Sequence, residues 1–164
     1  MEKIKVKNIM IGKQFQTCEN YQQFLKVVNE KKIKVCFVEA GQRIAIEKGL
    51  YFDVLWPSLK DRIYENSINN NSLVCKMTYH NFSILFTGDI EEVAEKAIIS
   101  KYDTNIEVLK STVLKVAHHG SKSSSVEEFV HFINPKIALI GVGKKNTFGH
   151  PNNGVLERLE QMRK

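Results

Sequence analysis

Residues 83–125 read SILFTGDIEEVAEKAIISKYDTNIEVLKSTVLKVAHHGSKSSS, and the interpretation of this chain depends on two motifs within them. One apolar run ends in TGD, at Asp89, and a second ends in AHHGS, at His118 and His119. Segment 91–100 between them has the apolar spacing of a helix. Two strands that deliver a carboxylate and an imidazole at their ends can bring both side chains to one edge of a sheet. The pattern predicts an α/β fold in which Asp89 lies near the histidines.

Asp89, His118 and His119 are candidate metal ligands. Aspartate oxygen and histidine nitrogen are donors that zinc and manganese accept. Asp89 is also suited to cap the helix that follows it, which is the alternative interpretation. Neighbouring residues of a strand point to opposite faces, so the two histidines are not expected to point the same way. One of them is expected to be a ligand, and the other to support it or to lie in the core.

Two loops are candidates for substrate binding. The first follows the histidines and contains Ser121, Lys122 and Ser123, and a helix N-terminus is expected near residue 126. Hydroxyls, a lysine and a helix N-terminus together suit a phosphate group, although an ordinary serine-rich loop with a helix cap has the same composition. The second loop reads GKKNTFGHP over residues 143–151 and contains Asn146 and His150. It follows an apolar strand, a position where catalytic loops often occur, although a histidine before proline is commonly a turn residue.

Composition indicates one globular domain of ordinary character. The chain has 164 residues, of which 43% are hydrophobic and 26% are charged, so a sizeable core is expected. Its net charge of +6 favours polyanionic partners, nucleic acid above all, although moderate basicity also occurs without such a partner. The three cysteines, Cys18, Cys36 and Cys75, are expected to be buried thiols and not disulfides. No apolar run approaches the roughly 20 residues of a membrane span. Residues 1–7 are not expected to be a signal peptide, because charged residues alternate with apolar ones and no apolar core follows.

The remaining elements follow from apolar periodicity and turn residues. Strands are expected at 3–11, 33–39, 43–46, 51–56, 72–79, 82–87, 112–117 and 136–142, and helices at 21–30, 90–101, 125–132 and 152–162. The run 136–142 is almost wholly apolar, which predicts a central strand covered on both faces. Residues 58–71 are polar and are expected to form the longest loop. His80 is expected at a hairpin tip and His131 within a helix, so neither is assigned to the site.

Taken as a set, these motifs resemble the metallo-β-lactamase fold hydrolases. The closest resemblance is to the soluble domain of ComEC-type competence proteins, which function in DNA uptake. The matching segments are NSLV at 71–74, ILFTGD at 84–89, LKVAHHGSKSS at 114–124, VG at 142–143 and the run 146–151, which ends in FGHP.

The resemblance implies a site and a chemistry. Asp89 matches the carboxylate that bridges two metals, and His119 is favoured as a ligand because it precedes Gly120 as the family's late His-Gly ligand does. His150 is assigned as a catalytic acid or donor at the rim of the site. Zn²⁺ or Mn²⁺ is the expected cofactor of a complete domain, and a phosphodiester, DNA in particular, is the expected substrate. Two close metals would activate a water and hold the phosphate oxygens.

One family motif is missing, because His-x-His-x-Asp-His does not occur and the five histidines stand at 80, 118, 119, 131 and 150. Residues 1–164 are therefore expected to form a single, truncated domain: the second half of an αββα sandwich plus part of the first. The function expected is that of a metal-dependent nuclease or phosphodiesterase that is inactive as this chain, and the alternative is a non-catalytic binding or structural module.

Such a chain is expected to be soluble and cytoplasmic, or external and membrane-associated within a full-length ComEC-type protein. A homodimer is expected if the missing half leaves a sheet face open.

Overall fold

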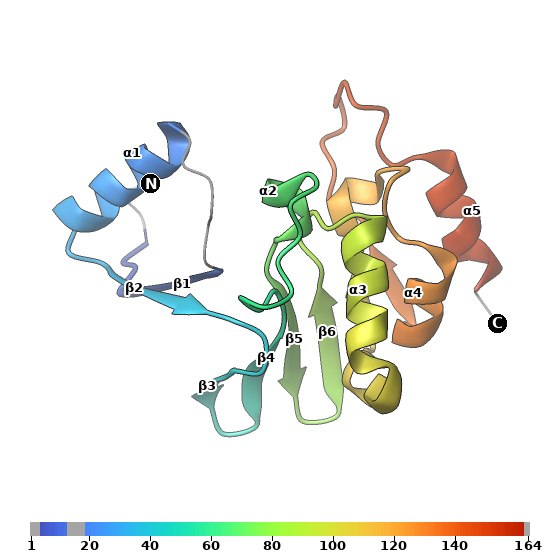
Figure 1. Ribbon diagram of the computed structural model, residues 1–164, viewed down its shortest axis with the longest axis horizontal. Coiled ribbons are helices and arrows are strands. Elements are labelled where there is room, and N and C mark those ends of the chain that lie inside the picture. Colours follow the sequence, from blue (N-terminus) through green and yellow to red (C-terminus); the bar gives the residue numbers. More distant parts are fainter. Residues whose placement is uncertain (1–3, 13–18, 163–164) are drawn as a thin grey trace.

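A six-stranded mixed sheet forms the centre of the computed structural model, which describes residues 4–12 and 19–162 (Figure 1). Its strands lie in the order of the sequence: β3 (Arg43–Glu47), β4 (Leu50–Trp56), β5 (Val74–Tyr79), β6 (Phe82–Phe86), β7 (Val113–Lys115) and β8 (Ile137–Leu139). Strands β3 to β6 pair antiparallel, whereas β6, β7 and β8 pair parallel. The strands β6, β7 and β8 therefore end at the same edge, which lies at the top of Figure 1.

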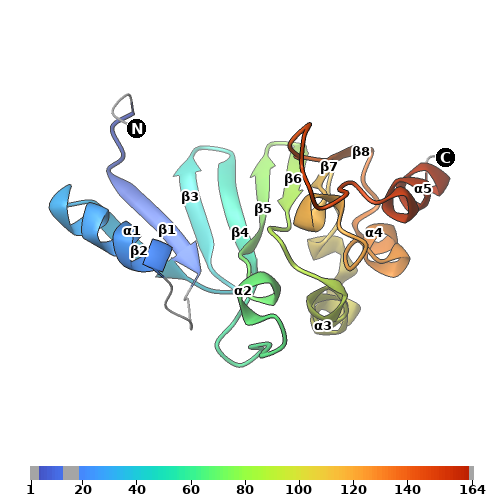
Figure 2. The same ribbon diagram turned by 90° about the horizontal axis from the view of Figure 1, so that it is seen from above.

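Helices cover one face of this sheet (Figure 2). They are α3 (Glu92–Tyr102), α4 (Glu127–Ile133) and α5 (Asn153–Gln161), and a short helix, α2 (Ser67–Asn70), lies beside the end of β4. The core lies between these helices and the sheet, and its largest side chains are Trp56, Leu85, Ile90, Ile98, Leu114, Phe129 and Ile133. Parallel strands need such crossover connections, and here α3 links β6 to β7 and α4 links β7 to β8.

A second, two-stranded parallel sheet lies at the β3 end of the molecule (Figures 1 and 2). It pairs β1 (Asn8–Gly12) with β2 (Lys34–Val38), and α1 (Glu19–Glu30) connects them. The predicted first strand is shorter than expected, since residues 4–7 are not in a strand and Lys3 lies outside the described residues. Cys18 also lies outside them, while Cys36 and Cys75 are partly buried free thiols.

The face of the six-stranded sheet opposite the helices is apolar and open. The strand register places the following residues on it, apolar except for the last: Phe52, Val54, Cys75, Met77, Ile84, Phe86, Val113, Ile137, Leu139 and Lys115. Ile137 and Leu139 are 52% and 51% exposed. Strands β3 and β4 extend this sheet and do not cover it. The described part of the chain is thus a mixed α/β fold with two sheets and five helices.

Two predictions about elements are wrong. The run 136–142 is not a central strand covered on both faces, because β8 is an edge strand and its three residues are exposed. Ile137 and Leu139 belong to the open face, whereas Ile140 packs against the core. A continuous apolar run cannot distinguish an uncovered surface from a covered one. Residues 58–71 are not a featureless loop, because α2 lies within them and Asn70 is fully buried. The indole Nε1 of Trp56 donates to the Asn70 carbonyl at 2.7 Å, which fixes this segment to the core.

Candidate functional site

The TGD turn places Asp89 at the end of β6. Gly88 has a φ of +58°, and a Cβ atom there would lie 2.6 Å from the Cβ of Ser72. Both the backbone conformation and the lack of space therefore require glycine at this position. The Ser72 hydroxyl accepts a hydrogen bond from the Asp89 amide at 3.2 Å, and the buried Thr87 hydroxyl donates to the Lys115 carbonyl at 2.6 Å. The Asp89 carboxylate does not cap α3, since that helix begins after Glu91. It is 44% exposed and therefore available to a ligand.

The two histidines lie in a tight turn after β7, not in a strand. β7 ends at Lys115, and His118 and His119 both adopt left-handed backbone conformations, with φ of +45° and +55°. The two side chains do point in different directions, but the turn separates them and not the alternation of a strand, so the reason given for that prediction is wrong. The His118 amide donates to the Gly88 carbonyl at 3.1 Å, which fastens this turn to the TGD turn. Two adjacent turns at the carboxyl edge of the sheet thus bring the two motifs together, as the sequence predicts.

His119 pairs with Asp89. Its Nε2 atom lies 3.6 Å from the Asp89 Oδ1 atom, and its Nδ1 atom lies 2.5 Å from the Gly141 carbonyl oxygen. A hydrogen bond from Nδ1–H to that carbonyl leaves the Nε2 lone pair directed at the neighbourhood of Asp89. The Gly141 carbonyl therefore orients the His119 ring so that its Nε2 lone pair can bind a metal ion or accept a proton.

His118 faces a different carboxylate, that of Glu91. The His118 Nδ1 atom is buried, makes no hydrogen bond to any described residue, and lies 3.4 Å from the Glu91 Oε1 atom. Glu91 also accepts hydrogen bonds from Ser123 Oγ at 3.1 Å and Asn66 Nδ2 at 2.9 Å. Glu91 is not among the site residues predicted from the sequence. Its position two residues after Asp89 is the one signal that could have identified it.

The serine loop, residues 121–125, is more buried than a solvent-exposed phosphate cradle would be. Ser121, Ser124 and Ser125 are buried, while Lys122 is exposed and Ser123 is partly exposed. The Ser121 and Ser123 hydroxyls lie 3.0 Å apart. The backbone N–H groups of Ser125 and Val126 already donate to the Glu95 carboxylate, so these two amides are not available to a phosphate.

The second loop lies against the histidine turn. The Asn152 amide donates to the Gly120 carbonyl at 2.8 Å, and a Cβ atom at Gly120 would lie 2.8 Å from the Pro151 Cβ atom. The His150 ring centroid is 5.8 Å from that of His118. Asn146 is occupied in shaping this loop, since its side-chain amide donates to the His150 carbonyl and its oxygen accepts from the His150 amide. The predicted site residues from both loops therefore come together at one edge of the sheet.

Lys115 is a second residue that the sequence interpretation did not assign to the site. It is the last residue of β7, and its ammonium group donates to the Val116 carbonyl at 2.8 Å. Burial lowers the pKa of Lys115, while the nearby Asp89 carboxylate acts in the opposite direction. It was recognisable as the one charged side chain in the otherwise apolar run 113–117.

The donor set is incomplete for a metal centre within the described residues. Asp89 and His119 present an oxygen and a nitrogen 3.6 Å apart, a spacing compatible with one shared ion. A stable zinc site takes three or four protein ligands, and no group of three or more histidine, cysteine or acidic residues in the described part of the chain could hold a metal. The residues described do not by themselves fit the metal centre that the resemblance implies.

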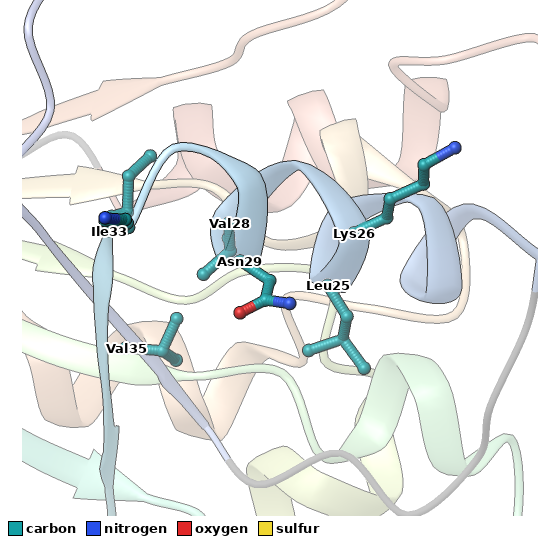
Figure 3. A pocket seen from close by; sticks show the side chains of 7 residues that line it. Leu25, Lys26, Val28, Asn29, Ile33 and Val35 are labelled. Carbon is teal, nitrogen blue, oxygen red and sulfur yellow. The ribbon is translucent and has the colours of Figure 1, made fainter.

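A hollow beside α1 lacks the side chains of a competing metal site. A hollow of about 740 Å³ lies where α1 passes over β2 (Figure 3). It is lined by Leu25, Lys26, Val28, Asn29, Lys32, Ile33 and Val35, which include no histidine, cysteine or carboxylate. His80 and His131 lie where the sequence predicts, at the tip between β5 and β6 and within α4. Among the described helices, none is long and apolar enough to cross a membrane.

Comparison with known proteins identifies relatives for this arrangement, although no family model matches the chain. The chain is 36% identical over 157 residues to ComE operon protein 3 of Bacillus subtilis, covering 96% of this chain and 19% of that protein. It is 35% identical over 113 residues to the uncharacterized protein YcaI of Escherichia coli, covering 69% and 14%. It is 32% identical over 127 residues to Competence protein ComA of Neisseria gonorrhoeae, covering 75% and 18%.

The chain thus spans less than a fifth of the length of each of these relatives. The alignment with the Bacillus subtilis protein covers nearly the whole chain, and so includes the Asp89, His118 and His119 turns. The protein described here is homologous to one segment of a group of much longer bacterial proteins, one of which is named for competence.

Proposed function

We propose that this chain is the phosphodiester-contacting part of a DNA-uptake protein, derived from a metal-dependent hydrolase of the metallo-β-lactamase fold. In this proposal the open apolar face corresponds to the side on which the other half of the αββα sandwich would pack. The chain by itself binds DNA and does not hydrolyse it efficiently. The relative named as a competence protein supports the biological setting, and the resemblance of the motifs supports the fold and the parent chemistry.

The observation that carries the proposal is the meeting of two lysine-bearing loops at the histidine turn. Lys122 in one loop and Lys144 and Lys145 in the other are exposed, and the second loop contacts the histidine turn, which leads into the serine loop, through Pro151 and Gly120. The two nearby carboxylates each face a histidine: Asp89 faces His119 and Glu91 faces His118. Exposed lysines that neutralise phosphates account for salt-dependent DNA binding without sequence preference.

DNA affinity measured against salt concentration tests this proposal. Wild-type chain is titrated into fluorescent single- and double-stranded DNA at several salt concentrations. Lys122→Ala and the pair Lys144→Ala with Lys145→Ala should weaken binding, and each lysine removed should lower the salt slope by about 1. Lys136→Ala is the matched control, because Lys136 is also exposed but precedes β8 and so lies at the opposite edge of the sheet. Equal effects of all these variants, or no binding by the wild type, would contradict the proposal.

Hydrolysis by this segment itself is the second candidate, and the Asp89–His119 pair favours it. These two residues would hold part of a metal centre, and the remaining donors would have to come from residues outside those described. A bound metal would supply an activated water and positive charge beside the phosphate. Metal-dependent cleavage of DNA by the chain alone would replace the binding proposal with this one.

A further inference from the structure

The α3 helix buries a carboxylate that neither the candidate site nor the resemblance accounts for. Glu95 is 0% exposed and lies on the face of α3 turned toward the serine loop. Its Oε1 atom accepts a hydrogen bond from the Ser125 amide at 2.6 Å, and its Oε2 atom accepts one from the Val126 amide at 2.8 Å. Both oxygens are therefore committed to backbone groups at the point where the serine loop becomes α4.

The backbone N–H groups of Ser125 and Val126 need a hydrogen-bond acceptor from another part of the chain. The amides at a helix start have no partner within the helix, and α4 has no side-chain cap of its own at Val126. Ser125 adopts a left-handed conformation, with a φ of +58°, and is 2% exposed, so water reaches it poorly. A carboxylate from α3 satisfies two buried N–H groups that would otherwise lack a partner.

Arg158 binds the carbonyl groups of the same two peptide units whose N–H groups donate to Glu95. Arg158 of α5 donates from Nε to the Ser125 carbonyl and from Nη2 to the Ser124 carbonyl, both at 3.1 Å. The charged groups that act on Glu95 are thus Arg158, across the loop on α5, and Glu92, on the surface of α3 itself. An acid and a base on two helices thereby bind consecutive peptide units of one loop.

Two further contacts connect the middle of the loop to the start of α3. The Glu92 amide donates to the Ser123 carbonyl at 2.8 Å, and the Ser123 hydroxyl donates to the Glu91 carboxylate. Glu91 and Glu95 are four residues apart and so lie on one face of the helix. The Glu91 contact also involves His118, so the loop and the histidine turn depend on the same helix face.

We infer that Glu95 is a positioning residue, which fixes the serine loop against α3 and thereby sets the placement of Ser121, Lys122 and Ser123 beside the histidines. The inference extends the proposed function. It depends on that function only for the identity of the ligand, which is the phosphodiester of DNA. Glu95 itself does not touch the ligand, because both of its oxygens are bonded within the fold.

Amide hydrogen exchange, measured without DNA, tests the inference independently of binding. In Glu95→Ala, the exchange of Ser125 and Val126 and the rate of trypsin cleavage after Lys122 should rise roughly tenfold, as expected for one lost hydrogen bond. Glu95→Gln keeps one carbonyl oxygen and should rescue part of the effect. The amides of Leu85 and Leu114 in the core should exchange as in the wild type. Glu92→Gln is the matched control, because it removes a carboxylate from the exposed side of the same helix.

DNA affinity completes the test. Compared at equal folded fraction, Glu95→Gln should weaken DNA binding several-fold, and Glu92→Gln should not. Unchanged exchange at Ser125 and Val126 in Glu95→Gln would overturn the inference, as would a uniform rise across the core. If the wild type does not bind DNA, the proposed function fails while the exchange result still decides whether Glu95 fixes the loop.

Discussion

The Nδ1 atom of His118 lies 3.4 Å from the Oε1 atom of Glu91, in a position where no other described residue offers it a hydrogen bond. The same carboxylate accepts hydrogen bonds from Ser123 and Asn66. Glu91 thus connects four parts of the chain: the start of α3, the histidine turn, the serine loop and the segment before α2. A residue with this many polar neighbours contributes to stability beyond any role at the site.

Replacement of Glu91 should therefore cost stability. Glu91→Ala leaves the Ser123 hydroxyl and the Asn66 amide without their acceptor, which should lower the free energy of unfolding by about 1–3 kcal/mol. Urea denaturation measures this loss. Glu92→Ala is the control, since Glu92 is exposed and its side chain pairs with Lys96 on the surface. Equal losses in the two variants would show that the Glu91 contacts do not matter.

Transition metals should bind this chain only weakly. Asp89 and His119 supply two donors, and tight zinc binding requires at least one more. Calorimetric titration with Zn²⁺ and with Mn²⁺, alongside a nuclease assay, checks this expectation. Tight stoichiometric binding with metal-dependent turnover would contradict it. It would also identify donors beyond the described residues.

In a form of the domain that hydrolyses DNA, Asp89→Ala and His119→Ala should abolish turnover, because each removes a donor from the pair at the sheet edge. His80→Ala and His131→Ala should retain it, since these residues lie at a hairpin tip and within α4. Turnover measured at equal folded fraction distinguishes the two pairs. A His131→Ala variant as damaged as His119→Ala, with its fold intact, would refute the site assignment.

Glu95 should make stability depend on pH. Burial raises the pKa of Glu95 from 4.5 to about 7, so the folded state binds its proton more tightly than the unfolded state does. The stability that Glu95 contributes is therefore greatest at low pH and falls as pH rises from 4.5 to 7. The full change is on the order of 3 kcal/mol, and the contribution stays constant above pH 7. The difference in unfolding free energy between wild type and Glu95→Gln, measured from pH 5 to pH 8, should follow this curve. A difference that does not vary with pH would contradict it.

The open sheet face should drive self-association. Ile137 and Leu139 are half exposed on the sheet face that also carries apolar residues of β4, β5 and β6, and exposed apolar surface tends to be buried by contact with another molecule. Sedimentation at micromolar concentration should show dimers or larger species, and Leu139→Lys should shift them toward monomer. Val93→Lys is the control, because Val93 is 40% exposed on α3, away from the open face. A wild-type monomer with a cooperative thermal transition would contradict this prediction.

Sequence periodicity predicted most of the elements because local rules determine them. The hairpin across His80 and Asn81 is confirmed, as is the helix capped by Asn152, whose side chain accepts from the Gly154 amide at 3.0 Å. The meeting of Asp89 with His119 is also confirmed, since two strand ends at one edge leave little freedom. These features depend on nearby residues or on one parallel pairing.

The features that the sequence did not predict depend on which distant parts of the chain cover each face of a helix or strand. In α3 the apolar Val93 is exposed and the acidic Glu95 is buried, the reverse of what their polarity predicts. The position of Glu95 follows from the serine loop, which is 26 residues further along the chain and cannot be placed by helical periodicity. Similarly, Ile137 and Leu139 lie on a sheet face that the described residues leave open.

The open face also has a consequence for denaturation experiments. The sensitivity of stability to urea, the slope m, grows with the surface that unfolding exposes, and so does the heat capacity of unfolding. A sheet with one face already in water has less surface left to expose. The isolated chain should therefore unfold with a shallower urea slope and a smaller heat-capacity change than its 164 residues would ordinarily give. Both quantities should rise with protein concentration, as association covers Ile137 and Leu139.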